Sequence, residues 1–214
     1  MKLYALNGSP RKDKNTATLL QSALDGAAST GATTEMIHLY DLTYKPCISC
    51  FLCKKLGGKS YGKCAVRDEL TPVLEKLAEA DGLIFGSPIY FGGISAQLRA
   101  FFERFLFQYV VYDVQYSSLA PKKMSTAFLY TMNVTEDMMR TLKYAELLRP
   151  MEFFVGNVFS PPQVMYACNT YQFDDYSKYK IECFSEADKA AHRERQFPVD
   201  MQAAFVMGEK MVAV

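Results

Sequence analysis

The feature that most constrains the fold of this chain is an alternation of short apolar strands and amphipathic helices that starts at its first residues. Residues 2–6 are typical of a strand, and the helix that follows can be capped by Asn15 or Thr16. The same pattern repeats along the chain. It predicts four further strands, at 34–39, at 83–85, at 125–131 and within 153–167. It also predicts four further helices: one that starts at Asp68, one that carries residues 98–105, one from Thr135 to about residue 148, and one over 203–211.

Repeated strand and helix units joined by right-handed crossovers build a parallel sheet with helices on both faces. Five such units favour a flavodoxin-like three-layer α/β sandwich with a five-stranded parallel sheet. We expect one domain over residues 1–214, whose part from about residue 160 is a less regular extension with a final helix. In this topology a ligand lies beyond the carboxyl ends of the strands, so the loops after the first, third and fourth strands should meet there.

Composition narrows the classes of function. The chain has 24 Lys plus Arg and 23 Asp plus Glu, and its net charge of +1 gives no field that would gather nucleic acid or an anionic membrane. No apolar run reaches the ~18 residues of a membrane span, and the amino terminus lacks a signal-peptide core. We therefore expect a cytoplasmic protein with neither partner, whose six cysteines are in a reducing compartment.

The loop after the first strand, residues 8–16, has the composition of an anion cradle. It combines hydroxyls, an amide, backbone N–H groups and a helix amino terminus. It lacks the GxxxxGK[ST] and GxGxxG patterns, so the expected ligand group is a single terminal phosphate such as that of FMN, and the alternative is an ordinary solvated turn. A phosphatase of this topology would need an arginine six positions after a cysteine, and a receiver domain would need paired acids in place of Asn7 and Gly8. The chain has neither.

The loop after the third strand, residues 87–95, combines flat aromatic side chains with two glycines that let a planar ring approach the backbone. Backbone N–H groups beside N5 and O4 of an isoalloxazine ring would stabilise the negative charge that grows there on reduction. We therefore expect the ring to lie against Pro88, Ile89, Tyr90, Phe91, Gly92 and Gly93. A surface turn with two apolar anchors is the alternative.

The sequences GSPRKDKNT after the first strand and GSPIYFGGISAQLRAFFER after the third resemble the NADPH-dependent FMN reductase family, over residues 1 to about 107. The resemblance implies a flavodoxin-like enzyme that binds FMN, reduces it with NAD(P)H and forms a homodimer or homotetramer. It assigns no catalytic acid or base. The residues it implies are Ser9, Arg11, Asn15 and Thr16 for the phosphate, Pro88 to Gly93 for the ring, and Thr131 and Asn133 as flavin neighbours.

Four of the six cysteines lie close together in the sequence. Cys47, Cys50 and Cys53 have the spacing that lets three thiolates face one metal cluster, and Cys64 is a candidate fourth ligand. The arrangement resembles the iron-sulfur flavoproteins, in which the fourth cysteine usually follows after a shorter gap. A [4Fe-4S] cluster, a zinc ion and reduced structural thiols are the three interpretations. Cys168 and Cys183 lack partners nearby in sequence and are expected to be buried apolar thiols.

Two further stretches bear on partners. The cysteine segment carries Lys45, Lys54, Lys55, Lys59, Lys63 and Arg67 without an intervening acid, which predicts either a solvated loop or a basic patch for NAD(P)H phosphates or an acidic redox protein. The aromatic residues between Phe101 and Tyr116 exceed what one helix buries, which predicts either core packing or a subunit interface.

Three hypotheses of function follow. The first is an FMN-dependent NAD(P)H oxidoreductase that passes electrons to a quinone, a flavin or a similar small-molecule acceptor. The second is an electron carrier with FMN and an iron-sulfur cluster on Cys47, Cys50, Cys53 and Cys64. The third is a regulatory domain that senses reduced cofactor through its thiols.

Overall fold

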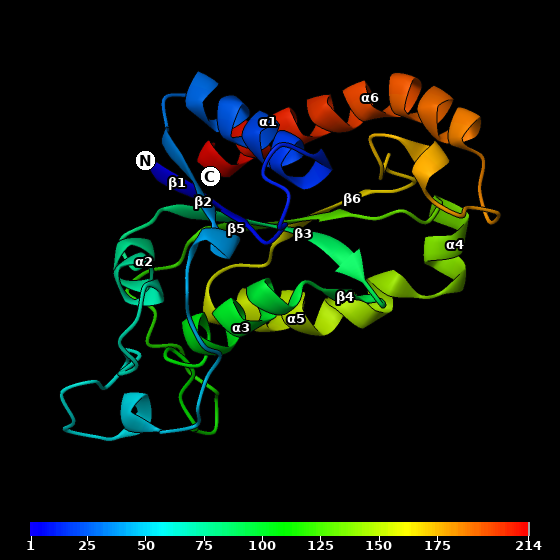
Figure 1. Cartoon of the computed structure of the whole chain (residues 1–214). Helices are drawn as coiled ribbons and strands as arrows, with labels where there is room; N and C mark the ends of the chain where they lie inside the picture. Colours follow the sequence, from blue (N-terminus) through cyan, green and yellow to red (C-terminus); the bar gives the residue numbers. More distant parts are fainter. Residues whose placement is uncertain (214) are drawn as a thin grey trace.

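The computed structural model describes residues 1–213 and contains a central parallel sheet (Figure 1). Its strands are β1 (Lys2–Asn7), β2 (Thr33–His38), β3 (Gly82–Tyr90), β5 (Ser125–Thr131) and β6 (Gln163–Ala167), in the order β2-β1-β3-β5-β6. The two-residue strand β4 (Gly93–Ile94) pairs antiparallel with the end of β3. The predicted five-stranded parallel sheet is confirmed.

Helices cover both faces of the sheet. One face carries α1 (Asn15–Ser29) and α6 (Glu186–Val212), and the other carries α2 (Leu70–Leu77), α3 (Ala96–Phe105) and α5 (Tyr144–Val158), while α4 (Glu136–Thr141) lies near the carboxyl end of the sheet. Successive β3 residues serve different cores: Leu83 and Phe85 pack with α2, α3 and α5, and Ile84 packs with α1 and α6. The continuous apolar run in β3 therefore reflects burial on both faces.

The aromatic stretch divides between core and surface. Phe101, Phe102 and Phe105 on α3 are buried around Phe85, with the Phe85 and Phe102 ring centroids 4.8 Å apart. Tyr112 and Tyr116, which lie in the loop after α3, are 64% and 66% exposed. Core packing thus accounts for the aromatic residues of α3 and for Tyr109, which is 4% exposed, but not for Tyr112 and Tyr116.

Several boundaries differ from the prediction for local reasons. Lys143 has a left-handed φ of 55°, which divides the helix expected from Thr135 into α4 and α5. α5 occupies the first part of 153–167, so the fifth strand is only Gln163–Ala167. The final helix starts at Glu186 instead of 203, because the Ser185 hydroxyl accepts from the N–H of Asp188 and caps it.

No helix within residues 1–213 is both long enough and apolar enough to cross a membrane.

Candidate functional site

A main-chain contact joins the loops that follow β1 and β3. The N–H of Gly8 donates to the carbonyl of Gly86 at 2.8 Å, directly after Asn7 and Gly86 pair in the sheet. A Cβ at Gly8 would lie 2.9 Å from Cβ of Leu98 and 3.1 Å from Oγ of Ser95, so the close approach requires glycine. The two loops therefore leave the sheet side by side.

The loop of residues 9–16 leads into an open helix start. Oγ of Ser9 accepts from the N–H of Arg11 at 3.2 Å. α1 begins at Asn15 with Lys14 at the cap position, where no described side chain forms a cap bond and no acid lies in the first turn. Neither Asn15 nor Thr16 is the cap, contrary to the prediction. The first-turn N–H groups and the positive end of the helix dipole thus form an arrangement that suits a phosphate.

Thr131 links this helix start to the strand that carries the second loop. The hydroxyl oxygens of Thr16 and Thr131 are 2.8 Å apart, and both residues are buried. Thr131 ends β5 in register with Pro88 on β3. One hydroxyl hydrogen is used in the bond between the two threonines, so the pair retains one donor for another acceptor.

Residues 88–93 form a hairpin instead of an open loop. β3 continues to Tyr90, and the turn consists of Phe91 and Gly92, whose φ values of 51° and 78° are both left-handed. A Cβ at Gly92 would lie 3.1 Å from Cδ1 of Leu147, so the turn rests against α5. The Phe91 side chain is fully exposed. The hairpin thus holds a flat aromatic side chain at the surface of the carboxyl edge.

The side chains of the two loops also interact through charge. Burial raises the pKa of Tyr90, and the positive charge of Arg11 acts in the opposite direction. The loop of residues 9–16 and the hairpin therefore share one electrostatic environment.

A distant segment, residues 171–174, lies across the loop of residues 9–16. The contacts are Arg11 Nη1 to the Gln172 carbonyl at 2.5 Å, Asn15 Nδ2 to the Tyr171 carbonyl at 2.8 Å, Lys14 Nζ to Asp174 Oδ1 at 2.7 Å, and Arg193 Nη1 to Asn15 Oδ1 at 2.8 Å. Both ends of the Asn15 amide are therefore engaged within the protein. Arg11 has five N–H donors and keeps others for a ligand.

No pattern in the sequence indicated this segment, because its residues lie far from the loop of residues 9–16 along the chain. Arg193 is 178 positions from Asn15, and Tyr171 is 156 positions away. Arg193 on α6 adds a cation beside Arg11 and Lys14 at the start of α1. Its role depends on the long final helix, which extends well before the predicted start at residue 203.

Asn133 has a buried side-chain oxygen that accepts no hydrogen bond from residues 1–213. Its main-chain carbonyl accepts from Nζ of Lys189 at 3.0 Å, and burial lowers the pKa of that lysine. An unpartnered buried acceptor is costly unless a bound group supplies a donor. The isoalloxazine ring carries an N–H group that can donate to this oxygen, so this part of the site fits FMN.

The four clustered cysteines lie elsewhere. Figure 1 shows their segment projecting below α2 and α3, away from the β4 hairpin. The free thiols of Cys47, Cys50, Cys53 and Cys64 line one hollow. No three His, Cys, Asp or Glu side chains in the described chain are close enough to hold one metal ion, which argues against a preformed zinc site. Four soft thiols around one hollow do fit a larger iron-sulfur group.

Two cations lie beside this hollow. Lys54 donates to the carbonyls of Phe107 and Val110, and its Nζ lies 4.6 Å from the Phe107 ring centroid. Lys54 therefore points inward and does not contribute to the predicted surface patch. Arg104 is buried and donates from Nε to Sγ of Cys64 at 3.4 Å.

The isolated cysteines differ from each other. Cys168 is partly buried, with its Sγ 3.7 Å from Sδ of Met139, and burial raises its pKa to about 11. Cys183 is exposed, so the prediction that it is a buried thiol is wrong. It lies in the irregular stretch before α6, whose aromatic rings pack on one another, Phe173 on Tyr179 and Tyr176 against Phe184.

Known sequences that resemble this chain belong to flavin-dependent proteins. The model of the family described as NADPH-dependent FMN reductase matches residues 1–164. An iron-sulfur flavoprotein of Methanocaldococcus jannaschii is 45% identical over 104 residues, which are 49% of this chain and 51% of that protein. An NAD(P)H dehydrogenase (quinone) of Trichlorobacter lovleyi is 34% identical over 88 residues, 41% of this chain and 40% of that protein. The matches thus span about half the length of these relatives or less.

Solved structures show the same fold at low identity. An NAD(P)H:quinone oxidoreductase of Methanothermobacter marburgensis superposes with a TM-score of 0.70 and 15% identity, covering 98% of this chain and 96% of the other. An FMN-dependent NADH-azoreductase of Bacillus anthracis, solved in complex with FMN, gives a TM-score of 0.60 and 14% identity, covering 100% and 98%. These likenesses establish a flavodoxin-like fold for the chain.

Proposed function

Because the chain belongs to the NADPH-dependent FMN reductase family, we propose that it is an FMN-dependent NAD(P)H oxidoreductase. When bound, FMN would supply at N5 the acceptor for a hydride from NAD(P)H and the donor of electrons to a second acceptor. A quinone or another flavin is the acceptor class we propose, since relatives of this fold include quinone oxidoreductases.

The observation that carries this proposal is the meeting of two loops that are about eighty residues apart in the sequence. The bond from Gly8 to Gly86 and the pair formed by Thr16 and Thr131 bring an anion-binding helix start beside an aromatic hairpin. A phosphate and a planar ring are the two ends of FMN. The separation of these two kinds of surface along one sheet edge therefore suits this cofactor.

In this proposal the phosphate is held by the first-turn N–H groups of α1 together with Ser9, Arg11 and Thr16. Asn15 acts differently from the prediction, because its amide already bonds Tyr171 and Arg193. It orients the segment that covers the loop and keeps Arg193 near the phosphate position. The site then presents net positive charge to the ligand.

The ring is held by the hairpin from Pro88 to Gly93 and by residues that follow β5. Thr131 shares a hydroxyl hydrogen bond with Thr16, and Asn133 offers an unpartnered acceptor. These groups orient the ring and stabilise charge on it, and no side chain is needed to move a proton. Phe91, fully exposed at the turn, lies where it can contact a second substrate.

The test is a titration of two flavins against the Arg11→Ala protein. Loss of a charged hydrogen bond costs about 1.5–3 kcal/mol, so FMN affinity should fall about tenfold or more while riboflavin, which lacks the phosphate, should bind as before. Lys12→Ala is the matched control, because Lys12 is an exposed neighbour paired with Asp41 at 2.5 Å. Equal losses for both flavins, or no loss for FMN, would count against the phosphate site.

A second function is favoured by the arrangement of the thiols. We propose that Cys47, Cys50, Cys53 and Cys64 hold an iron-sulfur cluster, which would carry single electrons between the flavin and a redox protein. The soft donor set and the single hollow support this, as does the name of the Methanocaldococcus relative. Iron and acid-labile sulfide in anaerobically purified protein are the test, and their absence after reconstitution would exclude the cluster.

A further inference from the structure

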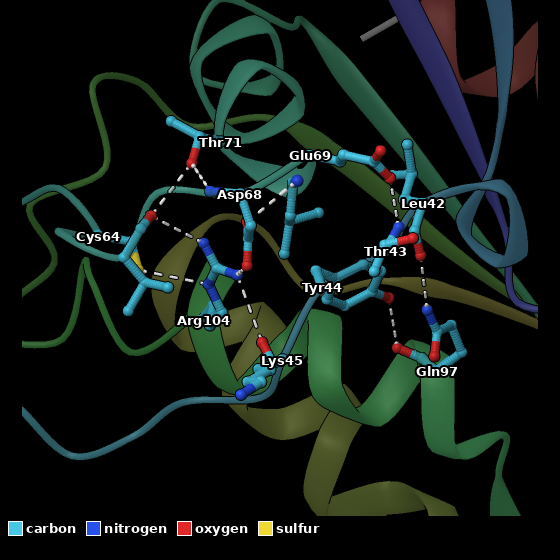
Figure 2. Close-up of polar contacts among 12 residues, drawn as sticks. Leu42, Thr43, Tyr44, Lys45, Cys64, Asp68, Glu69, Thr71, Gln97 and Arg104 are labelled. Carbon is cyan, nitrogen blue, oxygen red and sulfur yellow. Dashed lines mark hydrogen bonds and ion pairs between the residues drawn. The ribbon is translucent and has the colours of Figure 1, made fainter.

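The cysteine segment has little regular structure to hold it in place. Between residues 45 and 68, all of which the structure describes, the sole element is the short turn η2 (Leu52–Lys54). A segment of this kind has to be fixed by side-chain contacts. Arg104, near the end of α3, supplies four of them from one guanidinium (Figure 2).

The contacts of Arg104 reach both ends of the segment. Nη1 donates to the Lys45 carbonyl at 3.3 Å, just before the first cysteine. At the other end, Nη1 donates to Oδ2 of Asp68 at 2.5 Å, Nη2 to the Val66 carbonyl at 3.1 Å, and Nε to Sγ of Cys64 at 3.4 Å. One side chain therefore closes the segment that carries all four thiols.

Burying the charged side chain of Arg104 costs folding free energy. Its side chain is 0% exposed, and a guanidinium stays charged in a protein. Replacing a buried ion pair by apolar residues of similar volume is often neutral or stabilising, so the pair with Asp68 does not by itself explain a cation here. The bond from Nε of Arg104 to Sγ of Cys64 does explain why a cation lies here, because thiolates and a cluster carry negative charge.

A second side chain points to a group in the hollow. Oε1 of Gln108, one turn beyond Arg104, accepts from the N–H of Cys64 at 2.9 Å. Its Nε2 is buried and has no acceptor in the described chain, and Gln108 is one of the residues that line the hollow. A sulfur atom of a bound cluster would accept this hydrogen bond.

We propose that Arg104 is the positioning residue of the four-cysteine site: it preforms the site by joining both ends of residues 45–68, and its charge and N–H bond to Cys64 favour the reduced state of the bound cluster. Hydrogen bonds to cluster sulfurs and nearby charge are both determinants of cluster potential. The inference rests on the iron-sulfur function proposed above and is independent of the phosphate site.

The experiment uses the full chain, purified anaerobically with FMN. Arg104→Gln combined with Asp68→Asn removes both charges, so no carboxylate is left buried without a partner. Asp68→Asn alone is its reference, Arg104→Lys keeps the charge without the four bonds, and Arg99→Gln on the exposed face of the same helix is the matched control. The readouts are iron and sulfide per chain, the cluster midpoint potential, and amide exchange of residues 45–68 in the cluster-free protein.

We expect the double variant to have a tenfold lower ratio of reduced to oxidised cluster at fixed potential than Asp68→Asn, which is roughly 59 mV for one electron. It should also lose at least half of its iron, and its residues 45–68 should exchange faster. Arg104→Lys should show the faster exchange with a smaller shift in potential. Arg99→Gln should match the wild type in all three readouts.

A double variant that matches Asp68→Asn in iron, potential and exchange would overturn the role of Arg104 and leave the cluster in place. A wild-type chain without iron would overturn both the cluster and this inference, whereas flavin content in the same sample reports on the first function separately. If the double variant does not fold, unchanged exchange and potential in Arg104→Lys would overturn the proposal.

Discussion

Substitutions at Gly8 and Gly93 are expected to affect different properties, the stability of the fold at Gly8 and the binding of FMN at Gly93. A Cβ at Gly8 would clash with Leu98 at 2.9 Å, whereas one at Gly93 would meet only the Tyr90 carbonyl at 3.8 Å. Gly8→Ala should therefore lower the free energy of unfolding by about 1–3 kcal/mol. Gly93→Ala should leave it unchanged but weaken FMN binding, because a methyl group would keep the ring from the backbone.

Urea unfolding and FMN titration of the two variants check this prediction. Normal stability in Gly8→Ala would show that the loops are not packed as closely as described. Unchanged FMN affinity in Gly93→Ala would show that the isoalloxazine ring does not lie against the hairpin.

Cys168 provides a prediction about pH. Burial raises its pKa from 9.0 to about 11, which means that folding favours the neutral thiol. The contribution of this thiol to stability is therefore fully present below pH 9 and is lost as the pH rises toward about 11. The stability difference between the wild type and Cys168→Ala should shrink across that window.

Denaturation curves at pH 8, 10 and 11 measure that difference. Peptide mapping after brief alkylation at pH 8 gives a second readout, in which exposed Cys183 should be labelled much faster than Cys168. Equal labelling, or a stability difference that grows with pH, would contradict the burial of Cys168.

Local chemistry made some residues predictable and others not. Ser9, Arg11 and Thr16 follow a strand and precede a helix, so their place at the sheet edge follows from topology. Tyr171 and Arg193 reach the same place only through tertiary packing, and no spacing in the sequence relates them to Asn15. The inward turn of Lys54 has the same cause, since its charge indicated a surface position.

At the scale of elements, α1 and α6 cross through direct backbone contact. A Cβ at Gly208 would lie 1.8 Å from the Ala23 carbonyl oxygen, and one at Gly26 would lie 2.0 Å from that of Phe205. This crossing fixes α6, and α6 in turn places Arg193 beside the phosphate loop. The geometry of the proposed phosphate site thus depends on Gly26 and Gly208, which are remote from it.

Gly208→Ala should consequently destabilise the protein by about 1–3 kcal/mol or more, because neither backbone can retreat without moving a helix. FMN affinity should fall with it as Arg193 shifts. Lys210→Ala, an exposed change on the same helix, is the control. Urea midpoints for the pair test the prediction, and identical midpoints would rule out the close crossing.

Helices and strands with a strong apolar periodicity could be predicted from the sequence, whereas the residues at which they begin and end could be predicted less well. Residues 125–131 were predicted as a strand with the bounds that β5 has. The break between α4 and α5 depends on a left-handed Lys143, a residue type that seldom adopts that conformation. The hairpin at 88–93 was missed because its second strand, β4, is only two residues long.

One apolar surface of the molecule is exposed on α5 and the loop after α3. Tyr116, Phe153 and Phe154 are exposed around a hollow formed by α5 and the loop after α3. Aromatic residues are enriched in the cores of subunit interfaces. We therefore expect the protein to be a dimer or tetramer at micromolar concentration, and we expect Phe154→Asp to reduce its mass in solution.

Light scattering of both proteins provides the measurement. A wild type that is monomeric at micromolar concentration would contradict the interface. An oligomer that survives Phe154→Asp would locate the interface on a different surface.

We propose that one FMN lies across the edge of the sheet where the two loops meet, in a position to be reduced by a nicotinamide. The most direct measurement is the visible absorption spectrum of the anaerobically purified, FMN-supplemented chain before and after NADPH. We expect one FMN per chain and bleaching of its absorption on addition of NADPH. A chain that neither retains nor takes up FMN would contradict the account.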